Sequence, residues 1–334
     1  TQFGTEPIFI MILDQSTAQI LLHNMKRIRA VEEEIAERYS EWEMRCPTHL
    51  SIGQEAVAAV VGHLLNHDDL AVSTHRAHAH YLGKGGDLKA MIAEIYGKET
   101  GCSKGRGGSM HLIDKSVGFM GSTAIVGGTI PIGTGLALGM KYRKTEQISC
   151  IFVGDGAIEE GAFYESANFA ALHQLPILFI CENNLYSVYS SLSKRQPTGR
   201  KIHELAKEIG LSSDYADGND IMQIYEILEP TINAIRAGKG PSFIEFSTYR
   251  WREHCGPNFD NDIGYRSEEE FAEWKMKDPI SSFQHQLKVS SFIDDNILID
   301  MDEKIENEIK EAFNFAQESN FPNRETLAEY IYSD

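Results

Sequence analysis

The stretch from residue 148 to residue 184 decides the fold. It reads Ile148-Ser-Cys-Ile-Phe-Val153 followed by Gly154-Asp-Gly156, and later Ile177-Leu-Phe-Ile-Cys181 followed by Glu-Asn-Asn184. Each half is a short apolar run, typical of a buried strand, that ends in a polar turn. Small and aromatic residues between 163 and 171 recur at helical spacing. This strand–helix–strand order predicts two neighbouring parallel strands.

The sequence on either side continues the alternation of strands and helices. Residue patterns predict helices over Gln15–Arg45, Gly53–Leu65, His203–Ile209 and Ile221–Ala237, and a strand over Ser242–Ser247. We therefore predict an α/β fold in which a parallel sheet is flanked by helices. We expect one domain over 1–334, with a helical N-terminal extension over about 14–66, a core over about 67–250, and a mobile loop and acidic helical tail over 251–334.

The charge balance limits the classes of partner. Lys and Arg number 31 and Asp and Glu number 49, so the formal net charge is −18, and 42% of the residues are hydrophobic. This apolar fraction is typical of a globular protein and excludes a disordered chain. An acidic surface repels the phosphate backbone, so we expect no nucleic-acid partner. No apolar run approaches the ~20 residues of a spanning helix, so we expect no membrane partner.

The cysteines indicate a reducing compartment. The chain has five, at positions 46, 102, 150, 181 and 255, and no two are spaced as C-x-x-C. Scattered single cysteines are typical of reduced thiols and not of a disulfide framework or a thiolate zinc site. The apolar stretch from Pro7 to Leu13 lacks a basic region and a cleavage pattern, so we expect no signal peptide. We therefore expect a cytoplasmic protein.

Two polar turns at the ends of neighbouring strands predict a binding site. Asp155 and Asn184 follow the two strands, and ligands of open α/β sheets bind at that edge. A carboxylate, an amide oxygen and a backbone carbonyl suit Mg²⁺ and leave coordination positions for phosphate oxygens. Gly156 lets backbone N–H groups face an anion at the start of the next helix. We interpret the turns as a site that holds a diphosphate through a metal ion; the alternative is a plain turn and an unrelated Asn-Asn loop.

Six short motifs occur in order between Thr74 and Ser187. They are Thr74-His-Arg-Ala-His-Ala-His80, Ile95-Tyr-Gly-Lys98, Lys104-Gly-Arg-Gly-Gly-Ser-Met-His111, Ile125-Val-Gly127, Gly154-Asp-Gly-Ala157 and Cys181-Glu-Asn-Asn184. In this order the chain resembles the alpha subunits of thiamine-diphosphate-dependent 2-oxo acid dehydrogenases, including the pyruvate and acetoin members. Weaker similarity extends from about His49 to Arg266. The resemblance implies the thiamine-diphosphate-binding fold, of which this chain carries the diphosphate-binding module.

The resemblance also implies which residues hold the metal and the cofactor. Asp155, the side chain of Asn184 and the carbonyl of Tyr186 would bind Mg²⁺. Gly156 and Ala157 would offer backbone groups to the diphosphate of thiamine diphosphate.

Further positions match the remainder of the family's site. Arg76 would pair with the diphosphate, as a planar cation for a phosphate anion. Ala124 and Val126 would contact the aminopyrimidine through their backbone. Three histidines would be catalytic, because imidazole moves protons near neutral pH: His254 at the reacting centre, His49 near the substrate, and His75.

The same resemblance implies a reaction and partners. Thiamine diphosphate would carry the decarboxylation of a small 2-oxo acid such as pyruvate, or the cleavage of acetoin, and the acyl group would pass to lipoamide. In two-subunit enzymes of this kind a glutamate that touches the aminopyrimidine comes from the beta subunit. This chain shows only the diphosphate-binding half, so we expect a beta subunit in an α2β2 assembly and a lipoyl-bearing acyltransferase as a further partner.

One loop departs from the family's pattern. Pyruvate members carry His-Gly-His-Ser after Thr-Tyr-Arg, whereas Trp251-Arg-Glu-His-Cys255 follows here. Cys255 replaces a serine that is phosphorylated in mitochondrial members, so we expect no such phosphorylation. Arg252 and Glu253 bring charges beside the mouth of the active site. Two alternatives stay open: a stand-alone two-subunit enzyme with the same cofactor for biosynthetic decarboxylation or carboligation without lipoamide, and a binding subunit that has lost catalysis.

Other patterns have plainer interpretations. His75, His78 and His80 could form a zinc cluster, but the spacing lacks the aspartate of metallohydrolases, so we expect hydrogen-bonded histidines. The glycines from Gly133 to Gly139 are one residue too far apart for a dinucleotide fingerprint and indicate close helix packing. We expect the glycine-rich loops before them to carry function. Several basic residues are either solvated or flank phosphates and the partner: Lys104, Arg106, Lys194, Arg195, Arg200 and Lys201.

Overall fold

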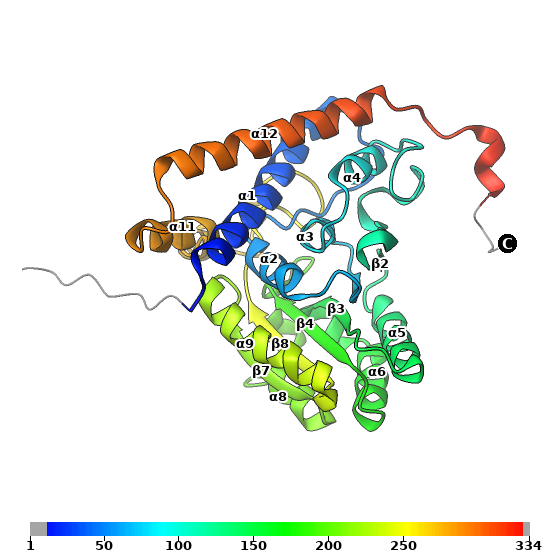
Figure 1. Ribbon diagram of the computed structural model, residues 1–334, viewed down its shortest axis with the longest axis vertical. Coiled ribbons are helices and arrows are strands. Elements are labelled where there is room, and N and C mark those ends of the chain that lie inside the picture. Colours follow the sequence, from blue (N-terminus) through cyan, green and yellow to red (C-terminus); the bar gives the residue numbers. More distant parts are fainter. Residues whose placement is uncertain (1–11, 330–334) are drawn as a thin grey trace, which may run out of the picture.

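A parallel sheet of six strands forms the centre of the molecule (Figure 1). The structure is a computed structural model and describes residues 12–329, so most of the stretch from Pro7 to Leu13 lies outside the described residues. The strand order across the sheet is β2-β1-β3-β4-β8-β7, and every pair is parallel. The strands are β1 (Leu70–Ser73), β2 (Phe119–Ser122), β3 (Ser149–Gly154), β4 (Ile177–Asn183), β7 (Ser212–Asp217) and β8 (Ser242–Ser247).

Successive residues of the central strands pack into two separate cores. On β3, Cys150 and Phe152 join the larger core, whereas Ile151 and Val153 join the smaller one. Strand geometry requires this alternation, since neighbouring side chains point to opposite faces. Both faces are therefore covered by helices, which confirms the α/β prediction.

Three helices cover the smaller core. They are α5 (Thr129–Arg143), α6 (Gly161–Leu172) and α8 (Ile202–Ile209). Gly133 lies where α5 crosses the sheet, and a Cβ on it would meet Ile151 Cγ1 at 2.5 Å. Close packing therefore explains this glycine, whereas a Cβ on Gly135 would meet no heavy atom within 4 Å.

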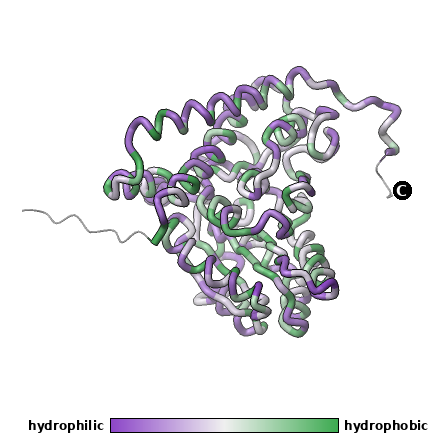
Figure 2. The backbone as a smooth tube through the Cα atoms, viewed as in Figure 1, coloured by the Kyte–Doolittle hydropathy of each residue, from purple (hydrophilic) through white to green (hydrophobic). Residues whose placement is uncertain are grey.

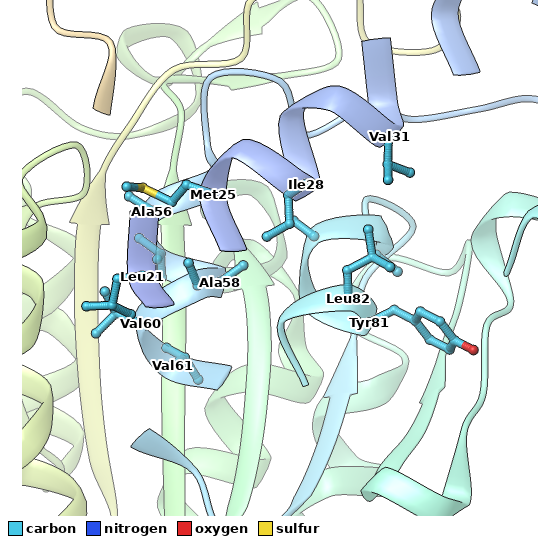
Figure 3. Packing of buried hydrophobic residues seen from close by; sticks show 14 of the residues in the cluster. Leu21, Met25, Ile28, Val31, Ala56, Ala58, Val60, Val61, Tyr81 and Leu82 are labelled. Carbon is cyan, nitrogen blue, oxygen red and sulfur yellow. The ribbon is translucent and has the colours of Figure 1, made fainter. Parts of the chain in front are cut away.

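The other face carries the N-terminal helices and α9. These are α1 (Gln15–Arg38), α2 (Glu55–Leu64), α3 (His78–Gly83), α4 (Leu88–Ile95) and α9 (Ile221–Ala234). Figure 3 shows side chains of α1 directed toward α2 and α3, among them Met25 and Ile28. The predicted helix to Arg45 is too long, because a 3₁₀ turn over Tyr39–Glu41 ends at Trp42, whose φ is 61°.

Three further helices form the predicted tail. They are α10 (Glu268–Lys275), α11 (Pro279–Val289) and α12 (Asp295–Glu318). Helix α12 lies along α1 at the edge of the molecule and is largely hydrophilic on the outside (Figures 1 and 2). Arg27 on α1 donates to Glu308 at 2.6 Å. None of the helices in residues 12–329 has the length and apolar character needed to cross a membrane.

A buried glutamate organises part of the glycine-rich region. The carboxylate of Glu94 accepts hydrogen bonds from the backbone N–H groups of Ser103, Gly105, Gly107 and Gly108, at 2.7 to 3.0 Å. Gly105 and Gly108 have φ of 72° and 60°, which other residues rarely adopt. These glycines therefore serve the structure of their own loop, and the function expected of the glycine-rich region stays a prediction.

Candidate active site

The chain reverses direction across the sheet between β1 and β3. It leaves β1 for β2 on one side and continues from β3 to β4 on the other. Such a switch point opens a crevice beyond the carboxyl ends of the strands, where α/β proteins bind ligands. Thr74 to Arg76 follow β1, Asp155 follows β3 and Asn184 follows β4, so all three segments meet there.

A cavity of about 180 Å³ lies at this switch point. Every site residue that the sequence predicts lines it: His49, His75, Arg76, Ala124, Val126, Asp155, Gly156, Ala157, Asn184, Tyr186 and His254. Complete small-molecule pockets usually measure roughly 300–1,000 Å³. The cavity is thus smaller than a complete pocket of this kind.

Asp155 is a buried carboxylate with a cationic partner. It is 2% exposed, and burial raises its pKa while Arg195 opposes that change. The guanidinium of Arg195 pairs with Asp155 and with Glu159. Arg195 ends the short helix α7 (Leu192–Arg195) and was predicted only as one basic residue among several, because no local pattern indicates a contact with Asp155.

The turn after β4 positions the amide of Asn184. Its Nδ2 donates to Gln54 Oε1 at 3.2 Å, and its Oδ1 accepts from the Tyr186 N–H at 3.2 Å. The Tyr186 hydroxyl donates a hydrogen bond to Glu270 Oε1 at 2.8 Å. Because a backbone N–H can only donate, the Tyr186 contact identifies Oδ1 of Asn184, and Gln54, which was not predicted from the sequence, then accepts from Nδ2.

Gly156 lies in the turn after β3 and packs closely against Ser187, which belongs to the segment after β4. A Cβ at this position would meet Ser187 Oγ at 2.7 Å and Ser187 Cβ at 3.0 Å. Any larger residue would push the two loops apart. The backbone of Gly156 and Ala157 can therefore approach a ligand closely.

Arg76 is a buried cation held by backbone carbonyls. Its guanidinium donates to the carbonyl of Leu50 and, at 3.3 Å, to that of His254. Burial and, secondarily, Arg250 lower its pKa to about 10. The group therefore remains charged at neutral pH and gives this end of the cavity a positive potential.

Three predicted catalytic histidines lie together. The ring centroids are 4.6 Å apart for His49 and His75, 5.1 Å for His49 and His254, and 5.3 Å for His75 and His254. Burial, with the Arg76 charge second, lowers their pKa values to about 2, 4 and 3 for His49, His75 and His254. All three imidazoles are therefore neutral at pH 7.

The other two histidines of the first motif point elsewhere. His78 lies between Glu32 and Ser109, at 3.1 and 2.8 Å, and His80 lies within 2.7 Å of Ser73 Oγ. His80 also contacts Glu182, which lines the cavity, at 3.0 Å. This confirms the expected hydrogen bonds for His78 and His80, whereas His75 lies with His49 and His254. Glu182 was missed, although it adjoins the Asn-Asn pair.

In the loop from Trp251 to Cys255, which departs from the family's pattern, the charged side chains contact other protein groups. Arg252 pairs with Glu33 and donates to the Pro257 carbonyl at 2.8 Å, and Glu253 accepts from the Asn258 N–H at 2.9 Å. Neither Arg252 nor Glu253 lines the cavity, although the adjoining His254 does, so their place beside its mouth stays a prediction. The mobility predicted for this loop stays a prediction.

Comparison with known proteins agrees with this geometry. Residues 23–325 match the dehydrogenase E1 component family, whose members depend on thiamine diphosphate. This chain belongs to that family and resembles its alpha subunits. It is 36% identical over 309 residues to the pyruvate dehydrogenase E1 component subunit alpha of Rickettsia bellii, covering 92% of this chain and 94% of that one.

Two other relatives are similar over nearly all of this chain. The alpha subunit of the acetoin:2,6-dichlorophenolindophenol oxidoreductase of Bacillus subtilis is 36% identical over 322 residues, covering 96% of this chain and 95% of that one. The chloroplastic pyruvate dehydrogenase E1 component subunit alpha-3 of Arabidopsis thaliana is 34% identical over 312 residues, covering 92% and 72%. These similarities confirm the family resemblance and the α/β fold.

Proposed function

We propose that this chain is the alpha subunit of an enzyme that decarboxylates a small 2-oxo acid such as pyruvate, or cleaves acetoin, and passes the acyl group to lipoamide. The observation that carries the proposal is that eleven residues predicted to hold the cofactor and to act on the substrate line one cavity at a switch point of the sheet. The names of the relatives, with pyruvate and acetoin among their substrates, support the same substrate class.

The residues present fit Mg²⁺ and a diphosphate. Asp155 is a buried carboxylate that already pairs with one cation, Arg195, and Asn184 and the carbonyl of Tyr186 add neutral oxygen donors of the kind that Mg²⁺ accepts. Arg76 and the backbone of Gly156 and Ala157 would hold the phosphate oxygens.

The walls near Ala124 and Val126 suit the other end of the cofactor. Val126 is 44% exposed and Ala124 half-buried, although both line the cavity. Their backbone groups would contact the aminopyrimidine, and the open side leaves room for a beta subunit. When bound, thiamine diphosphate supplies an electron sink for decarboxylation.

The three histidines would orient the substrate and move protons beside it. With pKa values near 2 to 4 they are weak bases in the free chain, and they serve as neutral hydrogen-bonding groups. The charge of Arg76 contributes to those low values. A diphosphate paired with Arg76 would offset this charge, raising the pKa values of the imidazoles toward the range in which they exchange protons.

We infer the partners from the incomplete walls of the cavity. A beta subunit would complete the site, in an α2β2 assembly, and a lipoyl-bearing acyltransferase would accept the acyl group. A reducing, cytoplasmic location fits the cysteines of the chain, which are all free thiols in the described residues.

Co-purification of the chain from its native source tests this proposal. We expect a second polypeptide of similar size, thiamine diphosphate released on denaturation, and a lipoyl-bearing acyltransferase. Recovery of a two-subunit enzyme that is active without any lipoyl domain would show that the acyl group passes to an acceptor other than lipoamide. Recovery of the chain alone, without thiamine diphosphate, would contradict the proposal.

A further inference from the structure

Three imidazoles from distant parts of the sequence meet at one point of the cavity. His49 precedes α2, His75 follows β1, and His254 belongs to the loop after β8. One ring nitrogen of each lies within 4.8 Å of the other two. Ligands around a tetrahedral zinc ion are about 3.3 Å apart, given Zn–N distances of about 2.0–2.1 Å. Small side-chain rotations would therefore bring all three nitrogens onto one ion.

His49 also carries a buried ring nitrogen without a hydrogen-bond partner in residues 12–329. Nδ1 of His49 is buried and has no hydrogen-bond partner among the described residues, and the His49 side chain as a whole is 6% exposed. A buried polar atom without a partner costs about 1–3 kcal/mol. A ligand that His49 binds through Nδ1 would remove that cost.

The charges around the rings both oppose and favour a cation. Arg76, whose guanidinium contacts the His254 carbonyl at 3.3 Å, repels a positive ion. Asp155, which pairs with Arg195, and Glu182, which contacts His80, line the same cavity and carry the opposite charge. The three imidazoles are neutral at pH 7, which is the state in which imidazole binds a metal.

We propose that His49, His75 and His254 form a binding site for a divalent transition-metal ion such as Zn²⁺, separate from the oxygen ligands at Asp155. Three nitrogen ligands select zinc or cobalt and discriminate against Mg²⁺, which prefers oxygen. Three protein ligands also leave a fourth position open. The site goes beyond the proposed function: an ion there would occupy the end of the cavity assigned to the substrate and would inhibit turnover.

Titration of the full-length, cofactor-free chain with Co²⁺ in excess Mg²⁺ tests the site. Co²⁺ shares the ligand preferences of zinc and absorbs visible light strongly when nitrogen ligands hold it in a tetrahedral field. The expected result is one strongly absorbing Co²⁺ per chain, displaced by Zn²⁺. Substitutions His49→Asn, His75→Asn and His254→Asn should each weaken Co²⁺ binding by more than about 100-fold, because even outer-shell partners contribute 10- to 100-fold.

Two matched variants keep the result specific. His285→Asn removes an exposed histidine of α11 and should leave the cobalt spectrum unchanged. Asp155→Asn should also keep the spectrum while it abolishes Mg²⁺-dependent binding of thiamine diphosphate, so failure of the proposed function is distinguishable from failure of this site. Circular dichroism verifies that each variant folds. If His49→Asn does not fold, the test rests on His254→Asn, because His254 is a half-buried loop residue. A chain without strong cobalt absorption, or a spectrum unaffected by all three substitutions, would overturn the proposal.

Discussion

The guanidinium of Arg195 lies against the carboxylate of Asp155, the residue that sequence reasoning assigned to the metal ion. A second nitrogen of Arg195 donates to Glu159 at 2.5 Å. The charge of the buried carboxylate is thus balanced by an arginine. Because a guanidinium and a metal ion compete for the same oxygens, loading of the metal requires Arg195 to move or share them.

Removal of this arginine should strengthen metal binding and weaken the free chain. For Arg195→Gln we expect Mg²⁺ affinity of the cofactor-free chain to rise about tenfold, or ~1.4 kcal/mol. The free energy of unfolding without metal should fall by about 3 kcal/mol, since Asp155 stays buried and unpaired. Calorimetric titration and thermal unfolding measure the two effects. The exposed Arg200→Gln is the control, and equal Mg²⁺ affinity in both variants would refute the competition.

Two glycines of α5 should respond in opposite ways to alanine. The Cβ of Gly133→Ala would meet Ile151 and Val72 at 2.5 to 2.9 Å, so overpacking should cost about 1–3 kcal/mol of unfolding free energy. Gly135→Ala meets nothing within 4 Å and should gain about 0.5–1 kcal/mol from helix propensity. Urea unfolding of the full chain compares them. Equal stability of the two variants would contradict the packing described for α5.

Glu94 should contribute strongly to stability through its loop. Glu94→Gln retains the shape of the side chain but loses the negative charge that receives four backbone N–H groups. We expect a loss of about 2–4 kcal/mol in unfolding free energy. The exposed Glu99→Gln on the following loop should change it by less than about 0.5 kcal/mol. Hydrogen exchange of residues 103–108 should accelerate only in Glu94→Gln.

The histidine cluster should make the chain sensitive to acid. Burial holds the pKa values of His49, His254 and His75 at about 2, 3 and 4, below the ordinary value of 6.5. Unfolding therefore takes up protons below pH 6.5, and the free energy of unfolding falls as pH decreases from about 6.5 to 4. Each histidine contributes a slope of up to about 1.4 kcal/mol per pH unit.

A histidine substitution isolates this contribution from that of the carboxylates. Denaturant unfolding of His254→Asn at several pH values should give a shallower dependence than the unaltered chain. The exposed His285→Asn should preserve the original slope. An identical slope in all three proteins would show that His254 does not resist protonation in the folded state.

The long apolar strands and the site on them were predictable from sequence. The run over Ile177–Cys181 is buried on both faces. Such a continuous apolar run is typical of a central strand in a parallel sheet, because helices cover both faces of the sheet. Asp155 and Asn184 follow adjacent strands, so proximity of the two side chains follows from topology alone. The histidines of the site came instead from the family resemblance, because no local pattern joins His49 to His254.

The missed elements have weak local patterns. Strand β1 has four residues, and β7 is an exposed edge strand of sequence Ser-Ser-Asp-Tyr-Ala-Asp, which reads as a polar loop. Helix α3 has six residues and contains two buried histidines. Tertiary contacts, which no short window contains, stabilise all three. The contact between Arg195 and Asp155 likewise depends on a turn that brings residues 40 positions apart together.

The most direct test of the central claim is Mg²⁺-dependent binding of thiamine diphosphate by the complex reconstituted with its beta subunit. Asp155→Ala should weaken this binding by at least about 100-fold, since the main ligand of the metal ion is lost. Asp214→Asn, an exposed aspartate on the edge strand β7, should leave it unchanged. If Asp155→Ala bound thiamine diphosphate with the same Mg²⁺ dependence as the unaltered complex, the cavity at the switch point would not be the cofactor site.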